Sequence, residues 1–67
     1  MIIEAEVESF DAARGDGLLR DARGREFYFH CVHIADGTRD IEPGTKVRAR
    51  RVVGLRGRDE AAELVKL

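Results

Sequence analysis

The chain has 67 residues, enough for one small domain but too few to enclose a deep catalytic cleft beside a hydrophobic core. Its 12 basic and 13 acidic residues give a formal charge of −1, so bulk charge does not attract phosphate, although a local basic surface is compatible with that total. These numbers favour a binding module over an enzyme, and we expect a single domain over residues 1–67.

The cysteine content and the first residues bear on where the protein works. Cys31 is the one cysteine, so the chain cannot form an internal disulfide, and small secreted domains usually need such crosslinks. The N-terminal residues lack the basic segment followed by an apolar one that is typical of a signal peptide. No apolar run approaches the roughly 20 residues that span a bilayer. We therefore expect a soluble, cytoplasmic protein that does not associate with membranes.

The first third of the chain predicts two strands. Residues 3–8 alternate apolar side chains with glutamates, which indicates a half-buried strand with an acidic outer face. A glycine-containing turn at residues 14–17 precedes a second strand at 18–20. Residues 21–25 then have the length and composition of a tight hairpin connection.

A third strand is predicted at residues 27–30, the most β-prone run of the sequence. Successive side chains of a strand point to opposite faces. We therefore expect Phe27 and Phe29 to point into the core, and Tyr28 and His30 to point outward.

The second half predicts two further strands. Residues 31–36 allow a single helical turn, and the glycines and proline of residues 35–44 indicate a loop. Residues 45–53 alternate again, with Val47 inward and Arg48 outward.

The fifth strand is less clear from the residues. Gly54 and Gly57 end the fourth strand, and residues 60–67 favour a helix by propensity. We predict a strand there, because four strands would leave an open edge. Five short strands with glycine-rich turns indicate a small all-β barrel, which we expect to be antiparallel.

The order of three motifs resembles the cold-shock domain family. Val-Glu-Ser-Phe-Asp at residues 7–11 is similar to that family's Val-Lys-Trp-Phe-Asn strand. Arg-Gly-Asp-Gly-Leu-Leu at 14–19 is similar to its Lys-Gly-Phe-Gly-Phe-Ile motif, and Phe-Tyr-Phe-His-Cys at 27–31 to its Val-Phe-Val-His-Phe motif. Later matching positions are Ile34, Gly37, Arg39, Ile41, Glu42, Gly44, Lys46, Val47, Gly54 and Gly57. The resemblance extends from about residue 5 to the C-terminus, with a one-residue insertion near residues 58–60.

This resemblance implies a five-stranded OB-fold-like barrel that binds single-stranded RNA or DNA. Rings on two adjacent strands would stack on bases, and basic groups would meet phosphates. Rings remain at three of the family's binding positions, and Arg14 keeps the charge of the motif lysine. The residues that we expect to contact nucleic acid are Phe10, Arg14, Tyr28, His30, Arg39 and Arg56, and for Phe10 packing in the core is an equal alternative.

Five of the family's ring positions carry no ring in this chain. The replacing residues are Ser9, Asp16, Leu18, Cys31 and Thr38. Stacking contributes about 1–3 kcal/mol per base, so these losses predict binding weaker by orders of magnitude. Asp16 also places a carboxylate near the expected path of the phosphates.

Charged residues gather in two further places. The first strand carries the acidic residues Glu4, Glu6, Glu8 and Asp11. Arginines concentrate near the fourth strand, namely Arg48, Arg50, Arg51, Arg56 and Arg58. We expect some of these arginines to pair with the acidic residues of the first strand.

A metal site is not predicted. His30, Cys31 and His33 lie within four residues, but no second cluster completes a tetrahedral set, and in a strand His30 and Cys31 would point to opposite faces. We expect neither metal nor cofactor. No acid–base pair or activated nucleophile is recognisable, so we expect no enzymatic activity.

Two functions therefore remain. The first is weak, sequence-tolerant binding of single-stranded RNA or DNA in the manner of an RNA chaperone. The alternative is a protein-interaction or self-associating barrel that has lost nucleic-acid binding, which the replacement of rings by Leu18, Thr38 and Cys31 fits. We expect a monomer or a weak homodimer.

Overall fold

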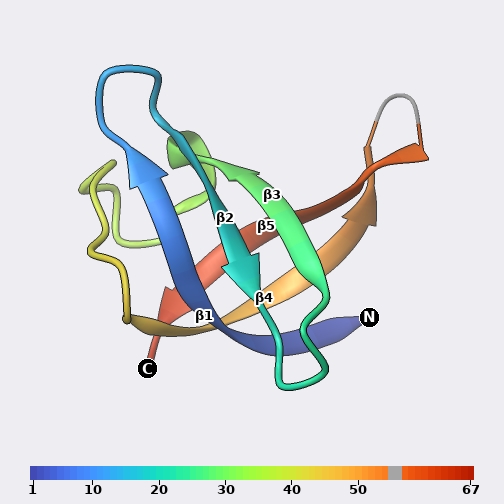
Figure 1. The fold of residues 1–67 in the computed structure, drawn as a ribbon. Helices are drawn as coiled ribbons and strands as arrows, with labels where there is room; N and C mark the ends of the chain where they lie inside the picture. Colours follow the sequence, from blue (N-terminus) through green and yellow to red (C-terminus); the bar gives the residue numbers. More distant parts are fainter. Residues whose placement is uncertain (55–56) are drawn as a thin grey trace.

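The computed structural model describes residues 1–54 and 57–67, and in these residues five strands form a closed barrel (Figure 1). The strands are β1 (Ile2–Asp11), β2 (Asp16–Arg20), β3 (Glu26–His30), β4 (Lys46–Val53) and β5 (Asp59–Lys66), with a 3₁₀ turn η1 (Cys31–His33) after β3. Neighbours follow the order β1-β2-β3-β5-β4, and β4 returns to β1. The predicted all-β, five-stranded barrel is confirmed, and its arrangement is consistent with OB-fold-like domains.

One pair of strands departs from the antiparallel arrangement that we expected. β3 and β5 run parallel, with Tyr28 opposite Glu60, whereas the other four neighbouring pairs are antiparallel. The reason is geometric, because strand direction cannot alternate all the way around a closed ring with an odd number of strands. The barrel is therefore mixed, and the fifth strand lies where the sequence placed it, over the residues with helical propensity.

The interior follows the predicted alternation. Phe27 and Phe29 are buried, and Tyr28 and His30 of the same strand face outward. The remaining core residues are Ile3, Val7, Leu19, Ile34, Ile41, Val47, Ala49, Ala61 and Leu64. Ile34 and Ile41 come from the segment between β3 and β4, so this segment closes one end of the barrel.

A β-bulge in β1 changes which residues of that strand face the core. Val7 pairs with Leu19, but Ser9 pairs with Leu18, so Glu8 is the extra residue. The inward positions before the bulge are odd-numbered, and after the bulge Phe10 is inward and Ser9 is exposed. The bulge therefore decides how β1 presents its side chains to the outer face.

Among residues 1–54 and 57–67, no helix is long and apolar enough to span a bilayer.

Candidate nucleic-acid interface

The outer face of β1, β2 and β3 brings several of the predicted binding residues together. In the row across these strands, Leu18 pairs with both Ser9 and Tyr28. Next to that row, Asp16 pairs with His30 on one side and with Asp11 on the other. Tyr28 and His30 are two residues apart on β3 and therefore point to the same face of the sheet.

An open hollow of about 570 Å³ lies on this face. It is lined by Ser9, Phe10, Asp11, Arg14, Asp16, Gly17, Leu18, Tyr28 and Arg58, which we call the Tyr28 hollow. Three of the predicted contact residues, Phe10, Arg14 and Tyr28, line it. Its wall thus combines rings and guanidinium groups with two carboxylates.

Phe10 lies between the hollow and the core. Its ring is half-buried and stacks on the Phe29 ring, with the centroids 5.9 Å apart and the planes 10° from parallel. Gly17 pairs with both residues and leaves the space between them open. A Cβ on Gly17 would collide with the Ser9 carbonyl oxygen and would lie 3.0 Å from the Phe29 ring. The Phe10 ring therefore packs on the core through its stack with Phe29, and the residue also lines the hollow.

Asp16 ties Tyr28 to Arg14. The Tyr28 hydroxyl donates to Asp16 Oδ2 at 2.9 Å, and Arg14 Nε donates to Asp16 Oδ1 at 3.0 Å, while Arg14 Nη2 forms an ion pair with the same oxygen at 2.9 Å. Partial burial works to raise the pKa of Asp16, but the hydrogen bonds from Arg14 and Tyr28 outweigh it and lower the pKa. The carboxylate is thus ionised at neutral pH and already paired.

The same hydrogen bonds act on the partners of Asp16. The bond to Asp16, together with desolvation, raises the pKa of the Tyr28 phenol. The hydrogen bond and charge of Asp16 raise the pKa of Arg14. The Arg14 side chain is nevertheless 70% exposed, so a phosphate from solvent can reach it.

Arg58 covers the Tyr28 ring. Its Cζ lies 4.1 Å from the ring centroid, and its Nη2 is 3.6 Å from Glu60 Oε2. We expected Arg58 to belong to the basic group near the fourth strand, and nothing in the sequence indicated its contact to Tyr28. The contact follows from the parallel pair, since Glu60 pairs with Tyr28 and Arg58 precedes it by two residues on the same side of the chain.

The other predicted contact residues lie outside the hollow. His30 is exposed in the neighbouring row, and its Nδ1 accepts a hydrogen bond of 3.3 Å from the Val32 amide. Arg39 is exposed in the segment between η1 and β4, with a φ of 56°. Arg56 lies outside the described residues. The prediction that His30 faces outward is therefore confirmed, whereas His30 and Arg39 both lie outside the hollow.

The arginines of this face are matched by carboxylates. Arg20 pairs with both Glu8 and Glu26, where a hydrogen bond between the two carboxyl groups and partial burial raise the pKa of Glu8. Arg14 and Arg58 pair with acidic residues in the Tyr28 hollow, as described above. The face therefore carries no net excess of positive charge, and any attraction for phosphate is short-range.

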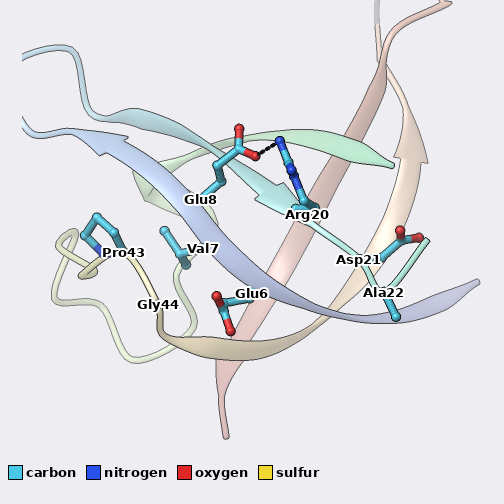
Figure 2. A pocket seen from close by; sticks show the side chains of 8 residues that line it. All are labelled: Glu6, Val7, Glu8, Arg20, Asp21, Ala22, Pro43 and Gly44. Carbon is cyan, nitrogen blue, oxygen red and sulfur yellow. Dashed lines mark ion pairs between the residues drawn. The ribbon is translucent and has the colours of Figure 1, made fainter. Parts of the chain in front are cut away.

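A second hollow lies farther along β1 and β2, at the end of β2 that carries Arg20 (Figure 2). It is lined by Glu6, Val7, Glu8, Arg20, Asp21, Ala22, Pro43 and Gly44. Its one arginine pairs with Glu8 (Figure 2), Glu6 adds a further negative charge, and the carboxylate of Asp21 is paired with Arg25. We call it the acidic hollow, and its charge is unsuited to a phosphate chain.

The arginines of β4 pair in two ways. Arg48 pairs with Glu4 of β1 at 3.1 Å, as we expected from the acidic strip. Arg50 and Arg51 instead pair across to β5, with Glu63 at 3.2 Å and with Asp59 at 2.7 Å. These pairs connect strands and leave the β4 surface electrically balanced.

The cluster at the end of β3 is arranged differently from our expectation. β3 ends at His30 and the chain turns into η1, so Cys31 is not part of the strand, and its Sγ lies 3.8 Å from His30 Nδ1. Cys31 itself packs partly against the core. Within the described residues, no group of three His, Cys, Asp or Glu side chains is arranged to hold a metal ion.

No protein-family model and no curated protein matches this chain. Its function has to be inferred from the barrel and from the residues of the two hollows.

Proposed function

We propose that this protein is a diverged cold-shock-like barrel that binds single-stranded RNA or DNA weakly, with little sequence preference, across the outer face of β1 to β3. The proposal is supported most by the Tyr28 hollow, where one ring and two arginines lie within reach of each other. Rings stack on bases of any sequence, and guanidinium groups bind phosphate oxygens in a bidentate manner.

The contacts have distinct roles. Tyr28 stacks on one base, and His30 in the neighbouring row stacks on the next. Arg14 meets the phosphate after exchanging part of its hydrogen bonding to Asp16. Leu18 and the edge of Phe10 provide apolar contact beside the stacked base.

Weak binding follows from the charge balance. If Arg14 and Arg58 neutralise two phosphates, the logarithm of the association constant falls with the logarithm of salt with a slope of about −1.4. One or two stacked bases contribute about 1–3 kcal/mol each. Two stacked bases at the upper value correspond to about 6 kcal/mol, a dissociation constant of about 40 μM, and the two phosphate contacts strengthen binding further at low salt.

Fluorescence anisotropy of a labelled single-stranded pyrimidine oligonucleotide at low salt tests the proposal. We expect saturable binding by the unaltered protein and about tenfold or greater weakening by Tyr28→Leu, since that substitution removes a stacking ring. Arg48→Lys, on the β1–β4 side and paired with Glu4, is the control and should bind as the unaltered protein does. No binding up to about 100 μM, roughly 5.5 kcal/mol of affinity, would sink the proposal.

A second function is favoured by a specific observation. The arginines of the β1–β3 face are paired with carboxylates, and apolar side chains are exposed elsewhere, including Ile2 and Val65, both 50% exposed or more. A barrel of this kind can associate with itself or with another protein. Sedimentation equilibrium at high protein concentration separates the two, since a strict monomer that binds oligonucleotide excludes self-association as the main activity.

A further inference from the structure

We propose that Arg58 covers the stacking surface of Tyr28 in the free protein, so that an incoming base must displace this guanidinium before it can bind. The inference rests on the proposed function and adds a competition step within the same site. It predicts a site that is masked by its own side chain until a strand arrives.

The distance is the first support. The guanidinium carbon lies 4.1 Å from the ring centroid, within the range of a cation–π contact. A stacked base would occupy the same space above the ring. Arg58 and a base therefore exclude each other on this ring face.

The Tyr28 ring is held in place, so the displacement must come from Arg58. The phenol oxygen is fixed by the 2.9 Å hydrogen bond to Asp16, and Asp16 is in turn held by Arg14. The Tyr28 backbone is paired on both sides, to Leu18 and to Glu60. Turning the ring away from Arg58 would break the bond to Asp16.

Arg58 is the mobile partner of the contact. Its side chain is 60% exposed, and its ion pair with Glu60 is long, at 3.6 Å. An exposed pair of this length contributes little to holding a side chain. Once displaced, the guanidinium lies at the rim of the hollow, where a phosphate of the bound strand can take the place of the ring.

Two binding measurements distinguish the competition between Arg58 and a stacked base from the contact between Arg58 and a phosphate. An oligonucleotide analogue with an uncharged backbone reports stacking alone, whereas the natural phosphodiester strand reports stacking and charge together. Arg58→Ala should bind the uncharged strand about two- to fivefold more tightly than the unaltered protein, the size of one exposed cation–π contact. The same variant should bind the natural strand no more tightly at low salt, because it has lost one phosphate contact.

The free protein offers an independent measurement. The chain has one tyrosine and no tryptophan, so its intrinsic fluorescence comes from Tyr28. Acrylamide should quench Tyr28 more strongly in Arg58→Ala than in the unaltered protein, by about twofold for a ring that gains an open face. Arg48→Ala removes an equivalent charge where β4 pairs with Val65, five residues further along β5 than Glu60, and should leave the quenching unchanged.

The outcomes distinguish this inference from the proposed function. Unchanged quenching in Arg58→Ala would contradict the proposal, because Arg58 would then not lie over the Tyr28 ring. Weaker binding of the uncharged strand by Arg58→Ala would also contradict it, because Arg58 would then hold the base in place instead of competing with it. Stronger quenching without binding of any strand supports the cover and refutes the proposed function. Circular dichroism checks that Arg58→Ala keeps the barrel.

Discussion

The interior of the barrel and the outer face of β1 to β3 use neighbouring residues of the same strands in different ways. Phe29 is 1% exposed and packs among apolar side chains, whereas Tyr28, one residue before it, is held by a hydrogen bond and a cation–π contact at the surface. The interior contacts are buried and cooperative, and the surface contacts are few and exchangeable. The difference shows how a barrel can keep its fold while the side chains of its outer face change.

The largest expected effect on stability comes from truncating a buried side chain of the interior. Phe29→Ala should destabilise the protein by about 3–5 kcal/mol, because it removes a buried ring and leaves a cavity. A chain of this length has a total stability of only about 3–10 kcal/mol, so the variant should be partly or wholly unfolded at 25 °C. Chemical unfolding followed by circular dichroism measures the loss.

Tyr28→Ala is the matched variant on the outer face. It should cost about 1 kcal/mol, the size of one hydrogen bond, and it should leave a cooperative transition. Equal losses from the two substitutions would remove the distinction between interior and face.

A loss between those of Phe29→Ala and Tyr28→Ala is expected at Gly17, where the interior and the face meet. Gly17→Ala places a Cβ against the Ser9 carbonyl oxygen and the Phe29 ring, so β1 or the ring must shift. We expect destabilisation of about 1–3 kcal/mol, as for overpacking elsewhere. Urea unfolding tests this, and a midpoint equal to that of the unaltered protein would show that the two strands are not held as closely as described.

A surface contact far from the hollow gives a pH-dependent effect. The backbone hydrogen bond from Thr38, the Lys66 side chain and the Thr38 hydroxyl lower the pKa of Asp36 from 3.8 to about 2. Because the pKa is lower in the folded state, the ionised form stabilises the fold above about pH 4, and this contribution is lost as the pH falls toward 2.

Asp36→Asn tests this linkage. The variant should lose part of the decrease in unfolding midpoint between pH 4 and pH 2, measured by urea unfolding at a series of pH values. An acid dependence identical to that of the unaltered protein would show that Asp36 does not tie the loop to β5.

The smallest effect is expected from one exposed arginine of the face. Arg14→Gln should leave stability nearly unchanged and should reduce the magnitude of the salt slope for single-strand binding by about 0.7, the value for one phosphate. Arg20→Gln is the control, since Arg20 lines the acidic hollow and pairs with Glu8 and Glu26. A change of the salt slope in Arg20→Gln but not in Arg14→Gln would show that the phosphates contact the acidic hollow and not the Tyr28 hollow.

Local alternation was sufficient to predict the strands and the inward residues of β3, because Phe27 and Phe29 are spaced for a pleated strand with one buried face. It also failed at a specific position. The bulge at Glu8 reverses the alternation of β1. No residue type at this position indicates a bulge, so the sequence left open whether Phe10 contacts the core or a base.

Contacts between distant segments could not be predicted from the sequence. Arg58 reaches Tyr28 because β5 lies beside β3, a neighbour relation fixed by closing the barrel and not by any local pattern. The pairing of Asp16 with Tyr28 depends on the register of β2 and β3. The strand pattern placed Tyr28 and His30 on the same outward face, but neither that pattern nor the family resemblance revealed the hydrogen bonds within the face.

Chemical-shift mapping by NMR tests the central claim most directly. A ¹⁵N-labelled protein is titrated with a short single-stranded oligonucleotide at low salt, and the amide shifts are assigned to the two hollows. We expect shifts at Ser9, Leu18, Tyr28 and Arg58 of the Tyr28 hollow, with Glu6 and Ala22 of the acidic hollow unmoved. Shifts confined to the acidic hollow, or no shifts at millimolar oligonucleotide, would contradict it.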